Sequence, residues 1–347
     1  MNIGIFVNDV RKEDPKYTST SLAKEVHNRG HRAIHIDVDD FAYAPDDKVY
    51  VWGRSAKKEK KYRSGNSFLD DIQAAEPVRF PVADLDVLLL RNDPSIDAVD
   101  RPWAQSVGII FGQLAMRHGV IVLNDPTGLS KVNNKLYFQF FPEMVRPRTL
   151  ISHKADELKA FVKKEKQAIL KPLQGSGGEG VFLVDTTKKS SNLNQIIETL
   201  GKGGYIIAQE YLPAAAKGDI RLFLMNGEPL RIGKTYAAIR RIARKEDIRN
   251  NMHSGGHIEP VEVTDRMLEL ANIVKPKLVQ DGMFLVGLDI AGDKLMEINV
   301  FSPGGLTSIS ETYDLDFIGT VVDALEEKVS HMRHYDRRFD NKEMATL

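Results

Sequence analysis

Apolar runs of strand length alternate with helical patterns along the first third of the chain. IGIFVND, near the start, and VLLLRNDP, ending at Pro94, are typical of strands buried on both faces. Helical spacing is present in SLAKEVHNRGH and WAQSVGIIFGQLAMRHG, and the expected helices stop at Gly30 and Gly119. Since strand and helix alternate through about residue 125, the pattern predicts an α/β domain over residues 1–125 with a mainly parallel sheet.

From residue 126 onward, strand patterns are joined by short turns. KVNNKLYFQFF is helical in spacing, QAILKPL and VFLVD flank a glycine-rich segment, and Asn226-Gly227 between two strand patterns is a strong hairpin signal. We expect two α+β subdomains with antiparallel sheets, over 126–205 and 206–330. The charged tail 331–347 is expected to fray, and the polar, basic segment 46–66 to form a surface excursion with a hairpin.

Composition narrows the functional classes. Hydrophobic residues make up 42% and charged residues 28% of the 347 positions, and the net charge is zero. Bulk charge therefore gives no argument for nucleic acid or acidic membranes as partners. The sequence has no cysteine, which excludes disulfides, thiolate metal sites and cysteine nucleophiles. The start lacks the features of a signal peptide, and no apolar run reaches the roughly 18 residues of a membrane span, so we expect a cytoplasmic protein.

The segment QGSGGEGVFLV is rich in glycine, as loops that bind phosphate often are. Its glycines at 175, 177 and 180 fit the spacing G-x-G-x-x-G, but a dinucleotide-binding turn must lead from a strand into a helix, whereas VFLVD reads as a strand. What remains is a strand, a glycine loop and a strand, whose free N–H groups can approach an anion. Lys171, at the end of the preceding strand, can reach phosphates under such a flap. The alternative is a flexible surface hairpin.

Three oxygen donors mark a second site in GLDIAGDKLMEINVF. Glu297 and Asn299 are two residues apart and point to the same face of one strand, and Asp289 can face them from the neighbouring strand. Two carboxylates and an amide suit Mg²⁺, which keeps several waters and shares phosphate oxygens. The alternative is an ordinary polar sheet face, but the surrounding residues are apolar, and unpaired carboxylates are costly in such a setting.

These segments, taken in order, resemble the ATP-grasp carboxylate–amine ligases, and most closely the bacterial glutathione synthetases, over about residues 1–328. The stretches that carry the resemblance are PVADLDVLLLRNDP, NNKLYFQFF, ILKPLQGSGGEGVF, AQEYLPAAAKGDIRLFLMNGEP, RNNMHSGGHIEP and VGLDIAGDKLMEINVFSP. The resemblance implies an ATP-grasp fold preceded by the parallel-sheet domain. It also implies ATP-dependent joining of γ-glutamylcysteine to glycine through an acyl phosphate, giving glutathione, ADP and phosphate.

The resemblance further implies roles for individual residues. The ATP contacts would be Lys135, Lys171, Gly175, Ser176, Gly177, Gly178, Gly180, Gln209, Glu210, Tyr211, Leu212 and Asp219. Arg221, Arg241 and Lys171 would face the transferred phosphoryl group, and Asp289, Glu297 and Asn299 would hold two Mg²⁺ ions, with Mn²⁺ a possible substitute. The substrate contacts would be Arg91, Arg249, Asn251, Gly255, Gly256, Ser302, Gly304 and Gly305.

Residues 241–256 are polar, basic and glycine-ended, as suits a loop that closes on an anionic substrate and keeps water from the acyl phosphate. A homo-oligomer is expected from the family. Ser19 is expected to cap the helix that follows it.

One stretch departs from the family pattern. SPGG at 302–305 has glycines where the enterobacterial synthetases carry bulkier residues, and SPG also occurs in ribosomal-protein-modifying glutamate ligases. The identity of the peptide and the amine therefore stays open, with a related peptide or amino-acid ligase as the alternative. A non-catalytic nucleotide-binding module is a third hypothesis, although the lysines and the oxygen donors that such modules lose are present here.

Overall fold

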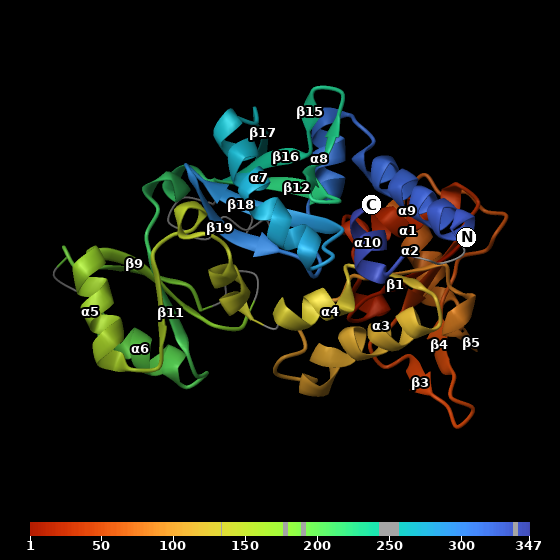
Figure 1. The fold of residues 1–347 in the computed structure, drawn as a ribbon, viewed down its shortest axis with the longest axis horizontal. Helices are drawn as coiled ribbons and strands as arrows, with labels where there is room; N and C mark the ends of the chain where they lie inside the picture. The colour runs from red at the N-terminus through yellow and green to blue at the C-terminus, as the bar shows by residue number, and fades with distance from the viewer. Residues whose placement is uncertain (133, 176–179, 189–191, 243–256, 336–338) are drawn as a thin grey trace.

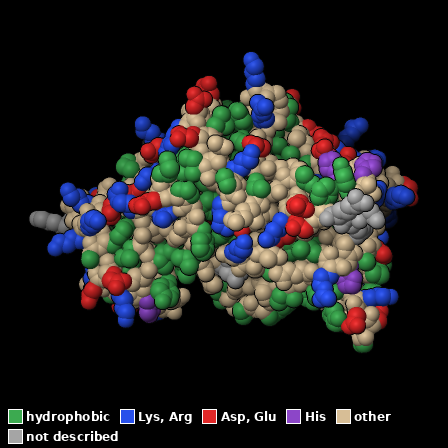
Figure 2. All heavy atoms as spheres, in the orientation of Figure 1, with side chains coloured by type: hydrophobic (Ala, Val, Ile, Leu, Met, Phe, Trp, Pro, Cys, Tyr) green, Lys and Arg blue, Asp and Glu red, His purple; other side chains and the backbone are tan. Residues whose placement is uncertain are grey.

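The computed structural model describes residues 1–132, 134–175, 180–188, 192–242, 257–335 and 339–347. Three lobes follow one another along the chain (Figure 1): an N-terminal α/β domain, a small middle lobe and a sheet-based C-terminal lobe. Positive and negative side chains are mixed over the face shown in Figure 2. No helix among the described residues has the length and apolar character needed to cross a membrane.

The N-terminal domain is built on the predicted parallel sheet, with strand order β2-β1-β6-β7. Its strands are β1 (Asn2–Phe6), β2 (Arg32–Ile36), β6 (Val87–Leu90) and β7 (Ile121–Leu123). Its helices are α1 (Thr18–Asn28), α2 (Gly65–Ala74), α3 (Val107–Arg117) and α4 (Pro126–Leu129). Side chains alternate between two cores: Ile3 and Ile5 pack with α1 and α2, whereas Phe6 belongs to the core that contains α3. Both faces are therefore covered, as a parallel sheet requires.

The segment 46–66 is only partly the surface excursion that its polarity predicted. Val49–Gly53 forms β4, which pairs with β3 (Phe41–Tyr43) and β5 (Val78–Pro81) in a small antiparallel sheet. A hairpin is present as β3–β4, but its first strand lies before residue 46, outside the segment in which the hairpin was predicted. Val49 and Val51 are buried because they lie on one face of β4, at the period of two that the basic neighbours obscured.

The middle lobe is an antiparallel sheet of order β10-β9-β11-β8, covered by two helices. Its elements are β8 (Thr149–Ser152), α5 (Ala155–Glu165), β9 (Gln167–Pro172), β10 (Phe182–Asp185), α6 (Leu193–Gly201) and β11 (Ile206–Glu210). The lobe has its own apolar core, formed by residues such as Leu158, Leu170 and Ala208. The glycine loop joins β9 to β10, so the predicted order of strand, loop and strand is confirmed.

The C-terminal lobe centres on an antiparallel sheet of order β17-β16-β12-β18-β19. Its strands are β12 (Asp219–Met225), β13 (Glu228–Pro229), β16 (Ala238–Ile242), β17 (His257–Pro260), β18 (Leu285–Ala291) and β19 (Lys294–Asn299), with β14 (Arg231–Ile232) and β15 (Thr235–Tyr236) as a separate pair. The helices are α7 (Asp265–Gln280) and α8 (Leu306–Tyr313). The predicted turn at Asn226-Gly227 joins β12 to β13, with positive φ at both residues.

Several short connections are 3₁₀ helices. They are η1 (Val10–Lys12), η2 (Val82–Asp84), η3 (Pro102–Ser106), η4 (Ser130–Val132), η5 (Lys135–Phe140), η6 (Glu143–Val145) and η7 (Pro213–Lys217). KVNNKLYFQFF was predicted to be helical, and it forms these tighter turns, η4 and η5, rather than an α-helix. The cap expected at Ser19 is wrong, because α1 begins one residue earlier and its N-cap residue, Tyr17, makes no side-chain cap.

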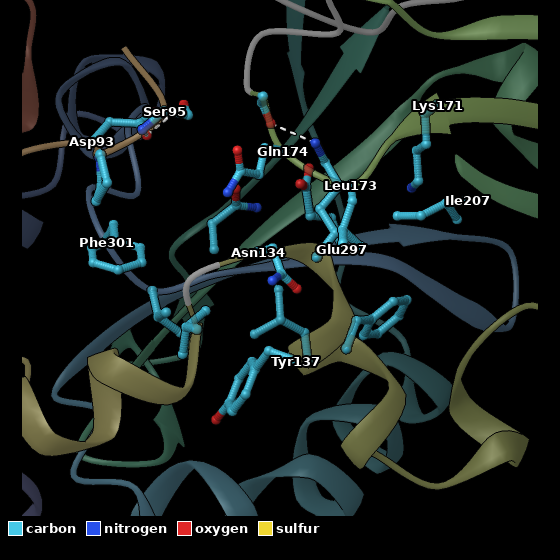
Figure 3. Close-up of a pocket in the computed structure, with 18 of the residues that line it drawn as sticks. Asp93, Ser95, Asn134, Tyr137, Lys171, Leu173, Gln174, Ile207, Glu297 and Phe301 are labelled. Atoms are coloured by element: carbon cyan, nitrogen blue, oxygen red, sulfur yellow. Dashed lines mark hydrogen bonds between the residues drawn. The ribbon is translucent and has the colours of Figure 1, made fainter. Parts of the chain in front are cut away.

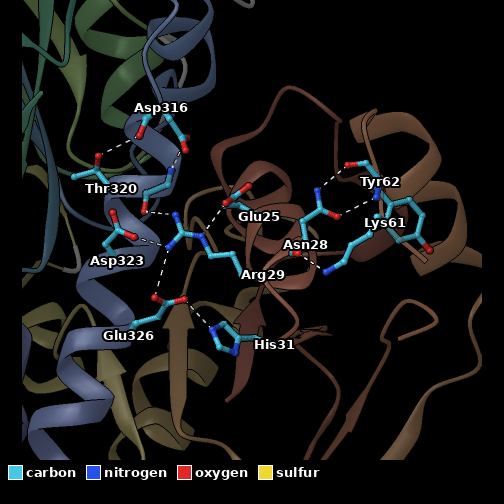
Figure 4. A network of polar contacts seen from close by, with 11 residues as sticks. Glu25, Asn28, Arg29, His31, Lys61, Tyr62, Asp316, Thr320, Asp323 and Glu326 are labelled. Atoms are coloured by element: carbon cyan, nitrogen blue, oxygen red, sulfur yellow. Dashed lines mark hydrogen bonds and ion pairs between the residues drawn. The ribbon is translucent and has the colours of Figure 1, made fainter. Parts of the chain in front are cut away.

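Most of the described residues of the tail are helical and do not fray, contrary to expectation: residues 331–334 end one helix, and 341–346 form another. α9 (Phe317–His334) lies along α1, where Arg29 forms ion pairs with Asp323 and Glu326 (Figure 4). α10 (Asn341–Thr346) begins with a capping box between Asp340 and Glu343 and buries Met344 and Ala345 in the core. The short helix is stable because capping and burial compensate for its length. The domain boundaries at 125, 205 and 330 stay a prediction.

His35 on β2 is a buried histidine that lies outside the candidate site. Its ring is fully buried and tilted against Phe68 at 6.0 Å between ring centroids, and neither ring nitrogen has a hydrogen-bond partner among the described residues. Burial lowers the pKa of His35 to about 4, from 6.5 in an exposed histidine. The folded state therefore keeps the ring neutral at pH values where the unfolded chain binds a proton.

This difference predicts a pH-dependent loss of stability. Between pH 6.5 and about 4 the unfolded state binds the extra proton, so the free energy of unfolding should fall as pH falls, by about 3 kcal/mol in total. His35→Leu should abolish this contribution, so the stability difference between the variant and the wild type should shift in favour of the variant as pH drops. Urea unfolding at pH 7.5, 6 and 5, with His334→Asn on the exposed end of α9 as a control, measures it. Parallel pH profiles for His35→Leu and the wild type would contradict the prediction.

Candidate active site

A cavity of about 170 Å³ lies between the middle lobe and the C-terminal lobe and extends to the loop that follows β6. Figure 3 shows Lys171 and Glu297 towards one end of it and Asp93 and Ser95 at the other. Seven of the predicted site residues line it: Lys135, Lys171, Gly175, Gln209, Glu297, Asn299 and Ser302. The structure therefore brings the first glycine of the loop and two of the three oxygen donors, Glu297 and Asn299, to one cavity. The other predicted donor, Asp289, does not line it, nor do Asp219, Arg221 and Arg241.

Two lysines point at this cavity without a carboxylate partner. Lys171 Nζ donates a hydrogen bond to Gln209 Oε1 at 3.1 Å, and Lys135 Nζ donates to the carbonyl of Gly175 at 2.5 Å. Within the described residues, neither lysine forms an ion pair. Burial lowers the pKa of Lys171 to about 8 and also lowers the pKa of Lys135, while the nearby charge of Glu297 opposes both shifts. An anion would supply the countercharge that these ammonium groups lack.

The oxygen donors lie on one hairpin, as predicted. β18 pairs with β19 so that Asp289 is opposite Glu297 and Gly287 is opposite Asn299, and Asn299 Nδ2 donates to Asp289 Oδ2 at 3.1 Å. Glu297 has neither a hydrogen bond nor an ion pair from its carboxylate within the described part of the chain. Such a free carboxylate can bind a divalent cation, and the two lysines beside it can bind the phosphate oxygens that the cation shares.

Arg221 and Arg241 converge on Asp289. Arg221 is bidentate, with Nε 2.5 Å from Oδ1 and Nη2 3.0 Å from Oδ2, and Arg241 Nη2 lies 2.9 Å from Oδ2 and also pairs with Asp219. Burial alone would raise the pKa of Asp289, but the two guanidinium groups outweigh it and hold that pKa well below its usual range. Cross-strand pairing fixes the cluster, because Arg221 is opposite Asp289 and Asp219 is opposite Arg241.

The segment 209–212, expected to contact the base and ribose, spans the end of β11: Gln209 and Glu210 are its last residues, and Tyr211 and Leu212 follow it. Glu210 is buried and forms ion pairs with Arg148 and with Lys294, the latter at 2.6 Å. Both of its carboxylate oxygens are thus occupied, and the ribose contact predicted for Glu210 stays a prediction, as do the contacts predicted for Tyr211 and Leu212. Gly175 and Gly180, at the two ends of the flap, have φ of 120° and 68°, which explains glycine at these positions.

Arg91 occupies a separate buried position directly after β6. It is 7% exposed, its Nη2 donates to the carbonyl of Pro303 at 3.0 Å, and its Nε has no hydrogen-bond partner among the described residues. Burial lowers the pKa of Arg91 to about 10, against the opposing charge of Glu13. Arg221 Nη1 donates to the next carbonyl, that of Gly304, at 2.9 Å. The loop 302–305 therefore joins the Arg91 position to the Asp289 cluster.

Part of the predicted site falls on residues that the structure does not describe. These residues are Ser176, Gly177 and Gly178 of the flap, and Arg249, Asn251, Gly255 and Gly256 of the expected closing loop. Their assigned roles stay predictions.

Sequence reasoning missed the cavity residues supplied by the N-terminal domain. Asp93 and Ser95, joined by a hydrogen bond of 2.6 Å, line the end of the cavity furthest from Lys171. The signal was present: they follow a buried parallel strand, and the carboxyl ends of such strands are where α/β sheets bind ligands.

Comparison with known proteins identifies the family. A model described as the prokaryotic glutathione synthetase ATP-grasp domain matches residues 134–314, and one for the N-terminal domain of that family matches residues 1–130. The chain is 36% identical to glutathione synthetase of Vibrio vulnificus over 332 residues, 95% of this chain and 98% of the relative. It is 32% identical to that of Escherichia coli K12 over 332 residues, 95% and 99% of the two chains.

Solved structures of other ligases share the fold. The chain matches D-cycloserine synthetase DcsG with a TM-score of 0.61 and 13% identity, over 93% of this chain and all of the other. It matches the ATP-grasp ligase PsnB, in complex with minimal precursor, Mg and ADP, with a TM-score of 0.58 and 16% identity, over 94% and 97% of the two chains. The predicted ATP-grasp fold is confirmed, and the matches over both domains mean that this chain belongs to the prokaryotic glutathione synthetase family.

Proposed function

We propose that this chain joins γ-glutamylcysteine to glycine at the expense of ATP, giving glutathione, ADP and phosphate. The observation that carries the proposal is a pair of lysines that have no carboxylate partner among the described residues and that line one cavity with Glu297, in a chain of this family. A related ligase with another amine acceptor is the second candidate. This candidate rests on the glycines at 304 and 305, where the family pattern has bulkier residues. A Cβ added at Gly304 would meet no described atom within 4 Å.

The reaction explains why the site concentrates positive charge. A carboxylate does not condense with an amine in water, so the γ-phosphoryl group of ATP is first transferred to the cysteinyl carboxylate. The nitrogen of glycine then attacks the acyl carbon, the C–O bond to phosphate breaks, and the ammonium proton is lost to solvent. Phosphoryl transfer depends on positioning and charge neutralisation. Lys135 and Lys171 hold phosphate oxygens, and Arg221 and Arg241 face the transferred group.

The residues of the β18–β19 hairpin fit a divalent cation. Glu297 and Asn299 offer oxygen donors to the cavity, and the carboxylate of Glu297 lacks a protein partner within the described residues. Asp289 lies opposite Glu297 on the adjacent strand, where Arg221 and Arg241 bind its two oxygens. We assign these three residues as ligands of Mg²⁺, with Mn²⁺ as a substitute. When bound, the ions would supply positive charge against the phosphate oxygens. The bidentate contact from Arg221 keeps Asp289 ionised and in place.

Two coarser features belong to the same proposal. We place the enzyme in the cytoplasm, since its thiol substrate and ATP belong to a reducing compartment. We also propose a homo-oligomer, supported by exposed apolar side chains on one stretch, Val99 at 87%, Trp103 at 55% and Ile110 at 51% exposure. Sedimentation equilibrium of the purified chain tests the latter.

A panel of substrate pairs tests the reaction. Phosphate release with ATP and Mg²⁺ is expected to require both γ-glutamylcysteine and glycine and to yield glutathione by mass spectrometry. Alanine, serine and glutamate serve as competing amines, and γ-glutamylalanine as a competing peptide. Turnover with another pair and none with γ-glutamylcysteine and glycine would favour the second candidate. ATP binding without turnover of any pair would instead support a non-catalytic module.

A further inference from the structure

Three segments meet at the carboxyl edge of the N-terminal sheet. The first turn of α1 contacts the start of α8, through a hydrogen bond of 3.3 Å from Leu306 N to Thr18 Oγ1 and one of 2.9 Å between Thr307 and Ser21. Arg91, after β6, binds the carbonyl of Pro303 in the same loop. The edge therefore faces the loop that leads to the Asp289 cluster, and open α/β sheets bind ligands at such edges.

Arg91 is incompletely satisfied at this edge. Its guanidinium is more than nine-tenths buried, one nitrogen donates to Pro303, and Nε has no partner in the part of the chain that the structure describes. A buried guanidinium without a carboxylate is costly, and a bidentate carboxylate is the ligand its geometry fits. The peptide's carboxylate in the proposed reaction can fill that position.

The carboxylate of Glu13 is the negative group whose charge acts on Arg91 at this edge. The residue follows β1, the strand next to β6, and its Oε2 accepts hydrogen bonds from Ser19 at 2.6 Å and Thr20 at 3.2 Å in the first turn of α1. Its other oxygen, Oε1, has no hydrogen-bond partner within the described residues. Burial raises the pKa of Glu13, and the charge of Arg91 acts against this shift, yet no ion pair joins the two side chains among those residues. Asp37, at the end of β2, adds a second negative charge on this side.

We propose that Glu13 is a specificity residue that binds the α-ammonium group of the γ-glutamyl end while Arg91 binds its α-carboxylate. A γ-linked glutamyl residue carries both groups on one carbon, and an α-linked peptide has no such pair at that end. Two opposite charges that are close but not in contact match this zwitterion. Ser19 and Thr20 fix the carboxylate, so Oε1 can accept from the ligand. The inference rests on the proposed function, because it concerns the same peptide.

The test uses the full-length enzyme, Glu13→Gln and N-glutarylcysteine, which lacks only the α-amino group of γ-glutamylcysteine. The wild type should show a KM for glutarylcysteine about 10- to 100-fold above that for γ-glutamylcysteine, because one charge-assisted hydrogen bond typically contributes about that factor to binding. Glu13→Gln should raise the KM for γ-glutamylcysteine by a similar factor, leave kcat little changed and leave the KM for glutarylcysteine unchanged. Asp14→Asn, at the exposed neighbouring carboxylate, is the matched control and should retain the wild-type preference.

The outcomes separate the two proposals. If the wild type uses both peptides equally, or Glu13→Gln loses the same factor on both, the assignment of Glu13 is overturned while glutathione synthesis stands. If the wild type does not turn over γ-glutamylcysteine, the proposed function fails first. Thermal unfolding checks that Glu13→Gln is folded; the comparison of peptides on the wild type does not depend on that variant.

Discussion

Lys171→Ala is expected to lower kcat by about 100-fold or more, with a weaker effect on the binding of the peptide. The ammonium group lies over the cavity, held by Gln209 and unpaired by any carboxylate in the described chain. Its charge is therefore available to a bound anion. Loss of such a charge weakens the transition state of phosphoryl transfer more than the bound ground state. Phosphate-release kinetics over a range of ATP and peptide concentrations measures the effect. Lys163→Ala, at an exposed lysine of α5 in the same lobe, is the control.

The same lysine predicts a pH dependence of ATP use. Burial lowers the pKa of Lys171 to about 8, so the free enzyme loses this charge as pH rises through about 8. The kcat/KM for ATP should therefore fall above that pH in the wild type, and Lys171→Arg, which stays charged, should move the fall to higher pH. A wild-type rate in Lys171→Ala, or a pH profile that the variants leave in place, would contradict the role given to Lys171.

The sequence predicts the parts of this site that depend on local pattern. The order of strand, glycine loop and strand follows from β-branched and aromatic residues after Gly180. The pairing of Asp289 with Glu297 follows from the period of two along the hairpin, and both are confirmed. Each needs only a short segment and the geometry of one strand pair.

Features that depend on tertiary contacts could not be predicted in the same way. Arg221 and Arg241 share Asp289 because β12 and β16 align in register with β18, which follows only after α7, and local spacing carries no information on that alignment. The position of Glu13 beside Arg91 likewise depends on the neighbouring order of β1 and β6. Helix α10 is a different case. Its capping signal, Asp340 with Glu343, is visible in the sequence, but the burial of the helix in the core depends on tertiary packing and could not be predicted.

Two substitutions are expected to distinguish the proposed cation site from the ion-pair cluster of Asp289, Arg221 and Arg241: Glu297→Gln and Asp289→Asn. Both changes preserve side-chain size and remove one negative charge, and both should lower kcat by about 100-fold or more. Their effects on stability should differ. The carboxylate of Glu297 has no partner among the described residues, so Glu297→Gln should leave the melting temperature near that of the wild type or above it.

Asp289→Asn, in contrast, leaves Arg221 with a neutral partner in a buried position and removes one of the two acids that Arg241 binds. Breaking a buried ion pair from one side typically costs about 3–5 kcal/mol, because the remaining charge stays desolvated. Unfolding in urea without added metal measures this cost, and kinetics with saturating Mg²⁺ measures turnover. Equal stability losses in the two variants would mean that Glu297 is also held by the fold, and a wild-type kcat in Glu297→Gln would remove it from the cation site.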